Sequence, residues 1–132
     1  MAGDKKVYEK SLRAGLNLAW EGQFEKALEA YQKALAEVPN DPVVLNHIGY
    51  AHLQLKHLQE ALEAYHEASR LSPNDPAPLA RMAEIHELVG QPHAAASAYL
   101  SLAEAHQRQL AWADAIQAQI RETLTERGGM PL

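Results

Sequence analysis

The sequence Ala-Leu-Glu-Ala-Tyr occupies residues 27–31 and returns letter for letter at residues 61–65, thirty-four residues later. The motif Pro-Asn-Asp-Pro at residues 39–42 returns at the same interval, at residues 73–76. A fixed period of this length is typical of stacked helical hairpins, in which no single unit can bury its own apolar face. Because such an array exposes a long surface and rarely encloses a reaction chamber, the repeat favours a binding scaffold over an enzyme.

Several positions hold the same kind of residue in successive units of this period. In units one, two and three these positions hold Gly15, Gly49 and Ala83, then Ala27, Ala61 and Ala95, then Tyr31, Tyr65 and Tyr99. With Pro39 and Pro73 at the unit ends, the pattern resembles the tetratricopeptide repeat over about residues 8–108. Small residues let two helices approach closely, and the aromatic ring fills the space between neighbouring hairpins. The resemblance implies an all-α, right-handed α-solenoid of antiparallel helical hairpins.

Local signals place the helices and divide the chain. Asp41 and Asp75 are expected N-caps, each followed by a Pro in the first helical position, and Gly22 and Gly90 end helices. The expected helices span about residues 5–20, 24–37, 42–55, 58–71, 76–89, 92–108 and 111–126. The expected repeat domain spans residues 1–127, with repeats at about 8–41, 42–75 and 76–108, a capping helix at about 111–126, and a flexible tail at 128–132.

The C-terminal segment departs from the period. Ala115 follows Ala95 by only twenty residues, so the helix at residues 92–108 fits both halves of the repeat template. The last helix is expected to pack back on its predecessor as a closing element, with Ile116 on its buried side. Polar Gln119 in a slot that would receive another repeat is typical of such a cap. Ile120 falls on the solvent side, where a single apolar residue is common, and this interpretation predicts a monomer.

Composition excludes several classes of function. The chain has 12 basic and 17 acidic residues, a net charge of −5 and no Cys. Nucleic acid is therefore not expected as a partner, and neither disulfides nor thiolate metal sites can form. No run of about 20 apolar residues predicts insertion into a membrane, and no signal peptide is recognisable, so we expect a cytoplasmic location.

The histidines and carboxylates do not form a recognisable catalytic or metal motif. Seven histidines are present, but no two are three or four residues apart, the spacing with which one helix face chelates a metal. His52 and His86 share a repeat slot that usually holds a packing aromatic ring. No strained nucleophile turn or glycine-rich phosphate loop is present. We therefore expect no enzyme activity, catalytic residue, metal or cofactor.

The resemblance implies a binding groove lined by the first helix of each hairpin. Carried over position by position, the groove residues are Arg13, Leu16, Trp20, Asn46, His47, Tyr50, Arg81 and Glu84. Of the charged clamp with which some co-chaperones of this family hold a carboxylate, only Arg81 is kept, so that partner class is not expected. The expected function is a scaffold or adaptor that binds a peptide segment or helix of another protein in this groove. The alternative is a self-assembly module that forms homo-oligomers.

Overall fold

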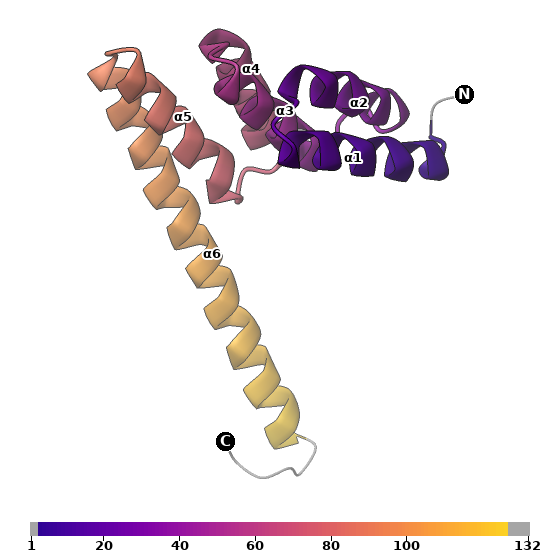
Figure 1. Ribbon diagram of the computed structural model, residues 1–132. Helices are drawn as coiled ribbons and strands as arrows, with labels where there is room; N and C mark the ends of the chain where they lie inside the picture. The colour runs from indigo at the N-terminus through magenta and orange to yellow at the C-terminus, as the bar shows by residue number, and fades with distance from the viewer. Residues whose placement is uncertain (1–2, 127–132) are drawn as a thin grey trace.

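A computed structural model describes residues 3–126, which form six helices and no strand (Figure 1). The helices are α1 (Lys5–Trp20), α2 (Phe24–Glu37), α3 (Pro42–Gln54), α4 (Leu58–Leu71), α5 (Pro76–Leu88) and α6 (Pro92–Glu126). Each helix packs on the next, so that three antiparallel hairpins stack in a row. The predicted all-α array of hairpins is confirmed, and α1 to α5 end within one residue of their expected positions. The tail expected at residues 128–132 lies outside the described residues.

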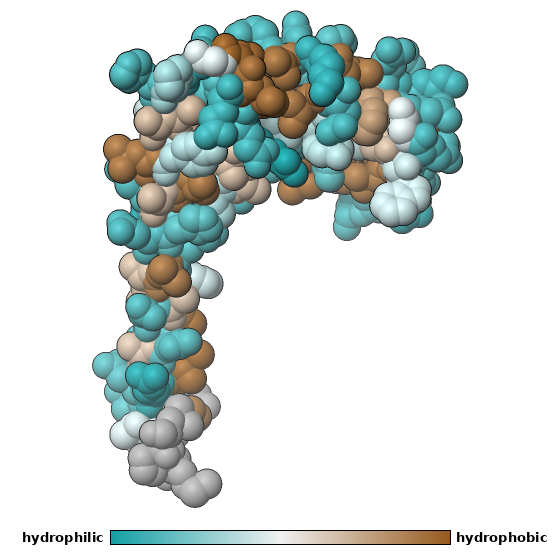
Figure 2. Space-filling model, turned by 60° about the vertical axis from the view of Figure 1, so that its left-hand side comes forward, coloured by the Kyte–Doolittle hydropathy of each residue, from teal (hydrophilic) through white to brown (hydrophobic). Residues whose placement is uncertain are grey.

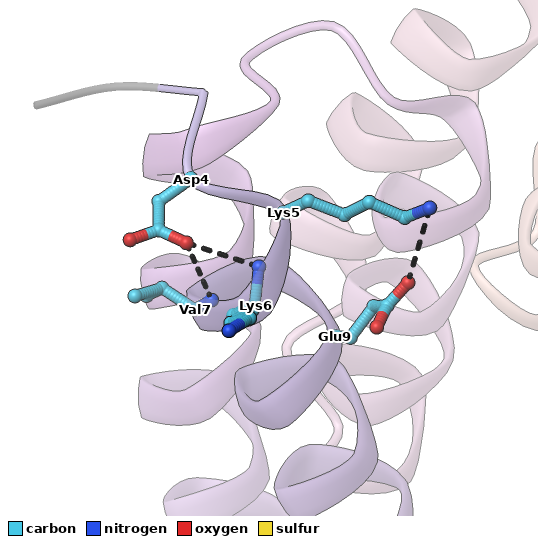
Figure 3. A network of polar contacts seen from close by, with 5 residues as sticks. All are labelled: Asp4, Lys5, Lys6, Val7 and Glu9. Atoms are coloured by element: carbon cyan, nitrogen blue, oxygen red, sulfur yellow. Dashed lines mark hydrogen bonds and ion pairs between the residues drawn. The ribbon is translucent and has the colours of Figure 1, made fainter.

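An aspartate precedes the first helix of each hairpin and binds its free backbone N–H groups. Asp41 and Asp75 act as the sequence predicts, and each carboxylate accepts one N–H from the first turn. Figure 3 shows a third cap, Asp4, whose Oδ1 accepts from the backbone N–H groups of Lys6 at 3.0 Å and Val7 at 3.2 Å. These bonds satisfy donors that have no partner within the helix, and so fix where each hairpin begins.

Each of the first two hairpins closes on a glycine that faces a tyrosine ring. A Cβ atom built on Gly49 would lie 2.9 Å from Cε2 of Tyr65, and Gly15 faces Tyr31 still more closely. Both rings are almost completely buried, at 1% and 2% exposure. The missing side chain therefore lets the ring pack directly against the neighbouring backbone and fill the hairpin interior.

The third hairpin lacks this contact. Ala83 replaces the glycine and is fully buried, whereas Tyr99 is 41% exposed and donates its hydroxyl to Glu87 Oε1 at 2.9 Å. Two differences account for the exposed ring. The methyl group of Ala83 occupies the space that the glycine leaves open, and no following hairpin covers the ring, since α6 is the last helix of the described chain.

The prediction of a separate closing helix at residues 111–126 is wrong. Residues 92–126 form one continuous helix of 35 residues, α6. The reason lies at residues 107–111, where Gln-Arg-Gln-Leu-Ala contains neither Gly nor Pro and consists of good helix formers. The earlier units end at Pro39 and Pro73, but Gln107 stands in that position of the third unit, so nothing stops the helix.

The C-terminal half of α6 stands clear of the other helices as a narrow stem (Figures 1 and 2). Ile116, expected to be buried, is 42% exposed, and Ile120 is 51% exposed. Among the described residues after Ala105, none is buried. Long as it is, α6 is not apolar enough to cross a lipid bilayer, and no other helix within residues 3–126 is a candidate for doing so.

The glycine contact predicts a measurable loss of stability. Gly49→Ala should lower the free energy of unfolding by ~1–3 kcal/mol, because the added methyl must displace the Tyr65 ring. At an unconstrained helix position the same change stabilises by ~0.5–1 kcal/mol. Urea unfolding measures the difference. In a chain that already carries Tyr65→Leu, Gly49→Ala should lower the free energy of unfolding by less. If Gly49→Ala alone leaves the free energy of unfolding unchanged or raises it, the proposed contact is contradicted.

The free-standing half of α6 predicts tolerance to truncation. Ending the chain after Leu110 removes no buried residue from the described part of the chain, which ends at residue 126, so the free energy of unfolding should change by less than about 1 kcal/mol. Urea or thermal unfolding of the two chains tests this. If the segment instead packed back on the hairpins, its removal would lower the free energy of unfolding by several times this amount.

Candidate functional site

Tyr50 of α3 and Arg81 of α5 meet on the surface of the array. The Arg81 guanidinium carbon lies 5.7 Å from the centre of the Tyr50 ring, which is a cation–π contact. The Tyr50 ring also meets Phe24, at the start of α2, edge to face with 6.1 Å between ring centres. One line of contacts thus joins α2, α3 and α5, while Tyr50 remains 40% exposed.

Charges of both signs lie beside the Tyr50 ring. Nη1 of Arg81 is 3.2 Å from Oε2 of Glu84, and both side chains are about half exposed. Beneath them, burial raises the pKa of Tyr65 to about 12, although the nearby Arg81 charge opposes the rise. The ring and the carboxylate together restrain the Arg81 guanidinium, so this side chain has little conformational freedom left to lose.

Three predicted groove residues lie on α1 and take no part in these contacts. Arg13, Leu16 and Trp20 are all exposed, and Trp20 is 91% exposed. Arg13 lines a shallow depression on α1 together with other residues of the same helix. Within residues 3–126, no aromatic, cation–π or ion-pair contact joins these three to Tyr50 or Arg81. An exposed Trp is nevertheless the kind of side chain that anchors a bound segment.

His47 and Asn46 are half-buried. The His47 ring stacks on Tyr31 with 5.7 Å between ring centres, and burial lowers its pKa. Asn46 Oδ1 is buried and has no hydrogen-bond partner in the described part of the chain. Such an atom is costly and uncommon in a stable interior. The structure therefore places His47 mainly in the packing between hairpins, whereas Tyr50 and Glu84 both contact Arg81 on the surface.

A second cluster contains possible metal ligands that are not three or four residues apart on one helix, so the spacing expected for chelation did not reveal it. His52 and His57 are five residues apart, yet their Nδ1 atoms lie 3.3 Å from each other. Glu60 lies beside them, and the three side chains are arranged so that they could hold a metal ion. Burial, and then the neighbouring His57, lower the pKa of His52. The pair meets across the turn between α3 and α4, which a spacing rule for a single helix does not consider.

Comparison with known sequences identifies the repeat. A family model described as Tetratricopeptide repeat matches residues 12–76, which contain α2, α3, α4 and part of α1. No curated protein sequence matches the chain at a significant level.

Solved structures share the fold. PcrH, in complex with the chaperone-binding region of PopB, has a TM-score of 0.75 at 21% identity, over 84% of this chain and 90% of PcrH. The second repeat domain of Spaghetti (RPAP3), bound to an HSP90 peptide, has a TM-score of 0.69 at 19% identity, over 75% of this chain and 92% of that one. MamA from Desulfovibrio magneticus RS-1 has a TM-score of 0.73 at 22% identity over 77% of this chain, but the match spans only 58% of MamA.

The exposed contacts of Arg81 predict that it contributes little to folding. Arg81→Ala should lower the free energy of unfolding by less than about 1 kcal/mol, since exposed ion pairs and cation–π contacts are each worth that or less. Urea unfolding provides the measurement. A loss of 2 kcal/mol or more, on the scale of a broken buried network, would instead assign Arg81 to the structural core.

Proposed function

Residues 12–76 belong to the tetratricopeptide repeat family, and on this premise we propose that the chain is a non-enzymatic adaptor. It binds a peptide segment or helix of another protein in the groove centred on Tyr50 and Arg81. The observation that carries the proposal is the cation–π contact between these two residues, which belong to different hairpins. A segment lying across them would contact two repeat units at once.

The chemistry of this centre suits recognition. Tyr and Arg are the side chains most often found at the energetic centre of binding surfaces, because they combine a large contact area with directed polar groups. Glu84 offers an acceptor beside the Arg81 donors, so the centre can bind both a carboxylate or carbonyl and an N–H group. Trp20 and Arg13 on α1 would extend the contact along the groove.

The structural relatives support a polypeptide as the ligand. PcrH is seen with a region of PopB, and the RPAP3 domain with an HSP90 peptide. In both, the partner is a segment of another protein. These likenesses are at 21% and 19% identity and concern the fold.

The binding test compares two arginines in matched surroundings. Affinity capture from the native host, with identification by mass spectrometry, supplies the partner, and its binding segment is then titrated by calorimetry. Tyr50→Ala and Arg81→Ala should each weaken binding by ~1–3 kcal/mol. Arg70→Ala is the control, because Arg70 forms the same kind of ion pair with a glutamate three residues away, on α4.

The double variant Tyr50→Ala, Arg81→Ala should keep the helical circular dichroism spectrum of the parent. If it binds the segment as well as the parent does, the groove proposal fails and the binding surface lies elsewhere on the chain.

Self-assembly is the second candidate, and α6 is the observation that favours it. Ile116, Ile120 and Leu124 recur every four residues, and together they line a shallow, mostly apolar depression on the free-standing half of the helix. Figure 2 shows hydrophobic side chains along one side of this stem. A second copy of the chain could cover this surface by pairing α6 with α6, as in other apolar helix pairs.

Sedimentation separates the two candidates. Under the adaptor proposal the chain sediments as a monomer at micromolar concentration, and Ile120→Glu changes nothing. A stable dimer that dissociates on Ile120→Glu, but not on Ala118→Glu on the opposite side of the helix, would make self-assembly the leading function.

A further inference from the structure

The first helix of every hairpin ends in the same turn. Two residues before the second helix begins, the backbone is left-handed, at Gly22, Lys56 and Gly90, with φ of 81°, 66° and 73°. In each turn the next backbone N–H donates to the carbonyl five residues earlier, at 2.8 to 2.9 Å. This is the Schellman arrangement, which brings the two residues joined by that bond side by side. The second hairpin keeps it even though Lys56 must adopt a conformation that usually requires glycine.

The side chains that this turn brings together differ among the hairpins. In the first they are Leu18 and Gln23, and in the third His86 Nδ1 lies 2.8 Å from Gln91 Oε1. In the second they are two histidines, His52 and His57, with 3.3 Å between their Nδ1 atoms and 5.5 Å between ring centres. Only this hairpin, among the three, therefore aims two imidazole nitrogens at one point.

We propose that His52, His57 and Glu60 form a binding site for a divalent transition-metal ion, with zinc as the best match. Each offers one ligand atom, and these atoms all lie within 4.8 Å of one another. Two nitrogen ligands of a tetrahedral zinc ion, with bonds of about 2.05 Å, lie about 3.3 Å apart. The observed separation of the two Nδ1 atoms equals this value, so the turn holds both rings at the spacing that zinc needs.

Glu60 completes a ligand set that zinc prefers. It lies three residues after His57, in the first turn of α4, so its carboxylate reaches the same side of the helix as the His57 ring. Two imidazoles and a carboxylate, with water in the fourth position, form a known zinc set. His57 and Glu60 are exposed, so an ion can enter from solvent. Bound there, it would join the end of α3 to the start of α4.

Metal binding requires that neither Nδ1 atom carries a hydrogen. The 3.3 Å separation of the two Nδ1 atoms fits a hydrogen bond in which one ring donates to the other, so the donating ring must change its tautomer when the ion binds. In the bound state both Nδ1 lone pairs point to the metal, and each ring carries its hydrogen on Nε2. Glu63, one helical turn beyond Glu60, adds negative potential near the site, and its charge acts on His52.

Titration of the full chain with zinc chloride, followed by calorimetry, tests the site. One ion per chain is expected. His57→Gln should weaken binding at least about tenfold, since a direct ligand is lost. This variant reproduces the natural His86–Gln91 pair of the third hairpin, so it should keep the turn and the fold. His86→Gln is the control and should leave zinc binding unchanged.

A transplant makes the test independent of any loss of folding. Gln91→His with Ala94→Glu places the same three ligands at the equivalent positions of the third hairpin. The number of zinc ions bound per chain should rise from one to two, and cobalt titration should give the visible absorption of tetrahedral coordination. Absence of zinc binding by the parent, equal binding by His57→Gln, or one ion in the transplant would each overturn the proposal.

Discussion

The close contact between a glycine and a tyrosine ring is the constraint on which the first two hairpins depend. Tyr31 and Tyr65 are buried because the facing residue has no side chain. Each ring then supports the next unit. His47 of α3 stacks on Tyr31, and Tyr65 lies near the Arg81 charge of α5. The contact that closes one hairpin thus also positions the residues that would bind a partner on the following one.

Where this contact is absent, the array ends. Ala83 faces a tyrosine that turns outward to Glu87, and no helix within the described chain packs on α6 as α3 and α5 pack on their predecessors. The final helix continues for 35 residues as a stem. The molecule therefore presents two different surfaces: a polar and aromatic one on the hairpins, and an apolar stripe on α6. The first suits a segment of another protein, and the second suits another apolar helix.

Sequence reasoning succeeded where a residue recurs with the repeat. The period predicted the hairpins, the positions that hold small residues, and the Asp41 and Asp75 caps. Each of these depends on local chemistry that is repeated in every unit. The repeat pattern predicted a helix end near Gln107, and this prediction was wrong. The first two units have a Pro at this position, but Gln107 does not stop the helix. The repeat pattern also did not predict the contact between His52 and His57. This contact depends on the left-handed backbone of Lys56, a conformation that a lysine rarely adopts and that the sequence therefore does not indicate. The groove positions could be listed from the template, but the pairing of Tyr50 with Arg81 depends on side-chain geometry that no spacing specifies.

The central claim is that a partner segment binds across Tyr50 and Arg81. Nuclear magnetic resonance of the chain during titration with the captured partner segment tests it most directly. The account predicts that the side-chain Nε–Hε signal of Arg81 and the ring signals of Tyr50 shift as the segment saturates the chain, while the signals of Ile116 and Ile120 do not. Shifts confined to the stem of α6, with Arg81 and Tyr50 unmoved, would contradict it.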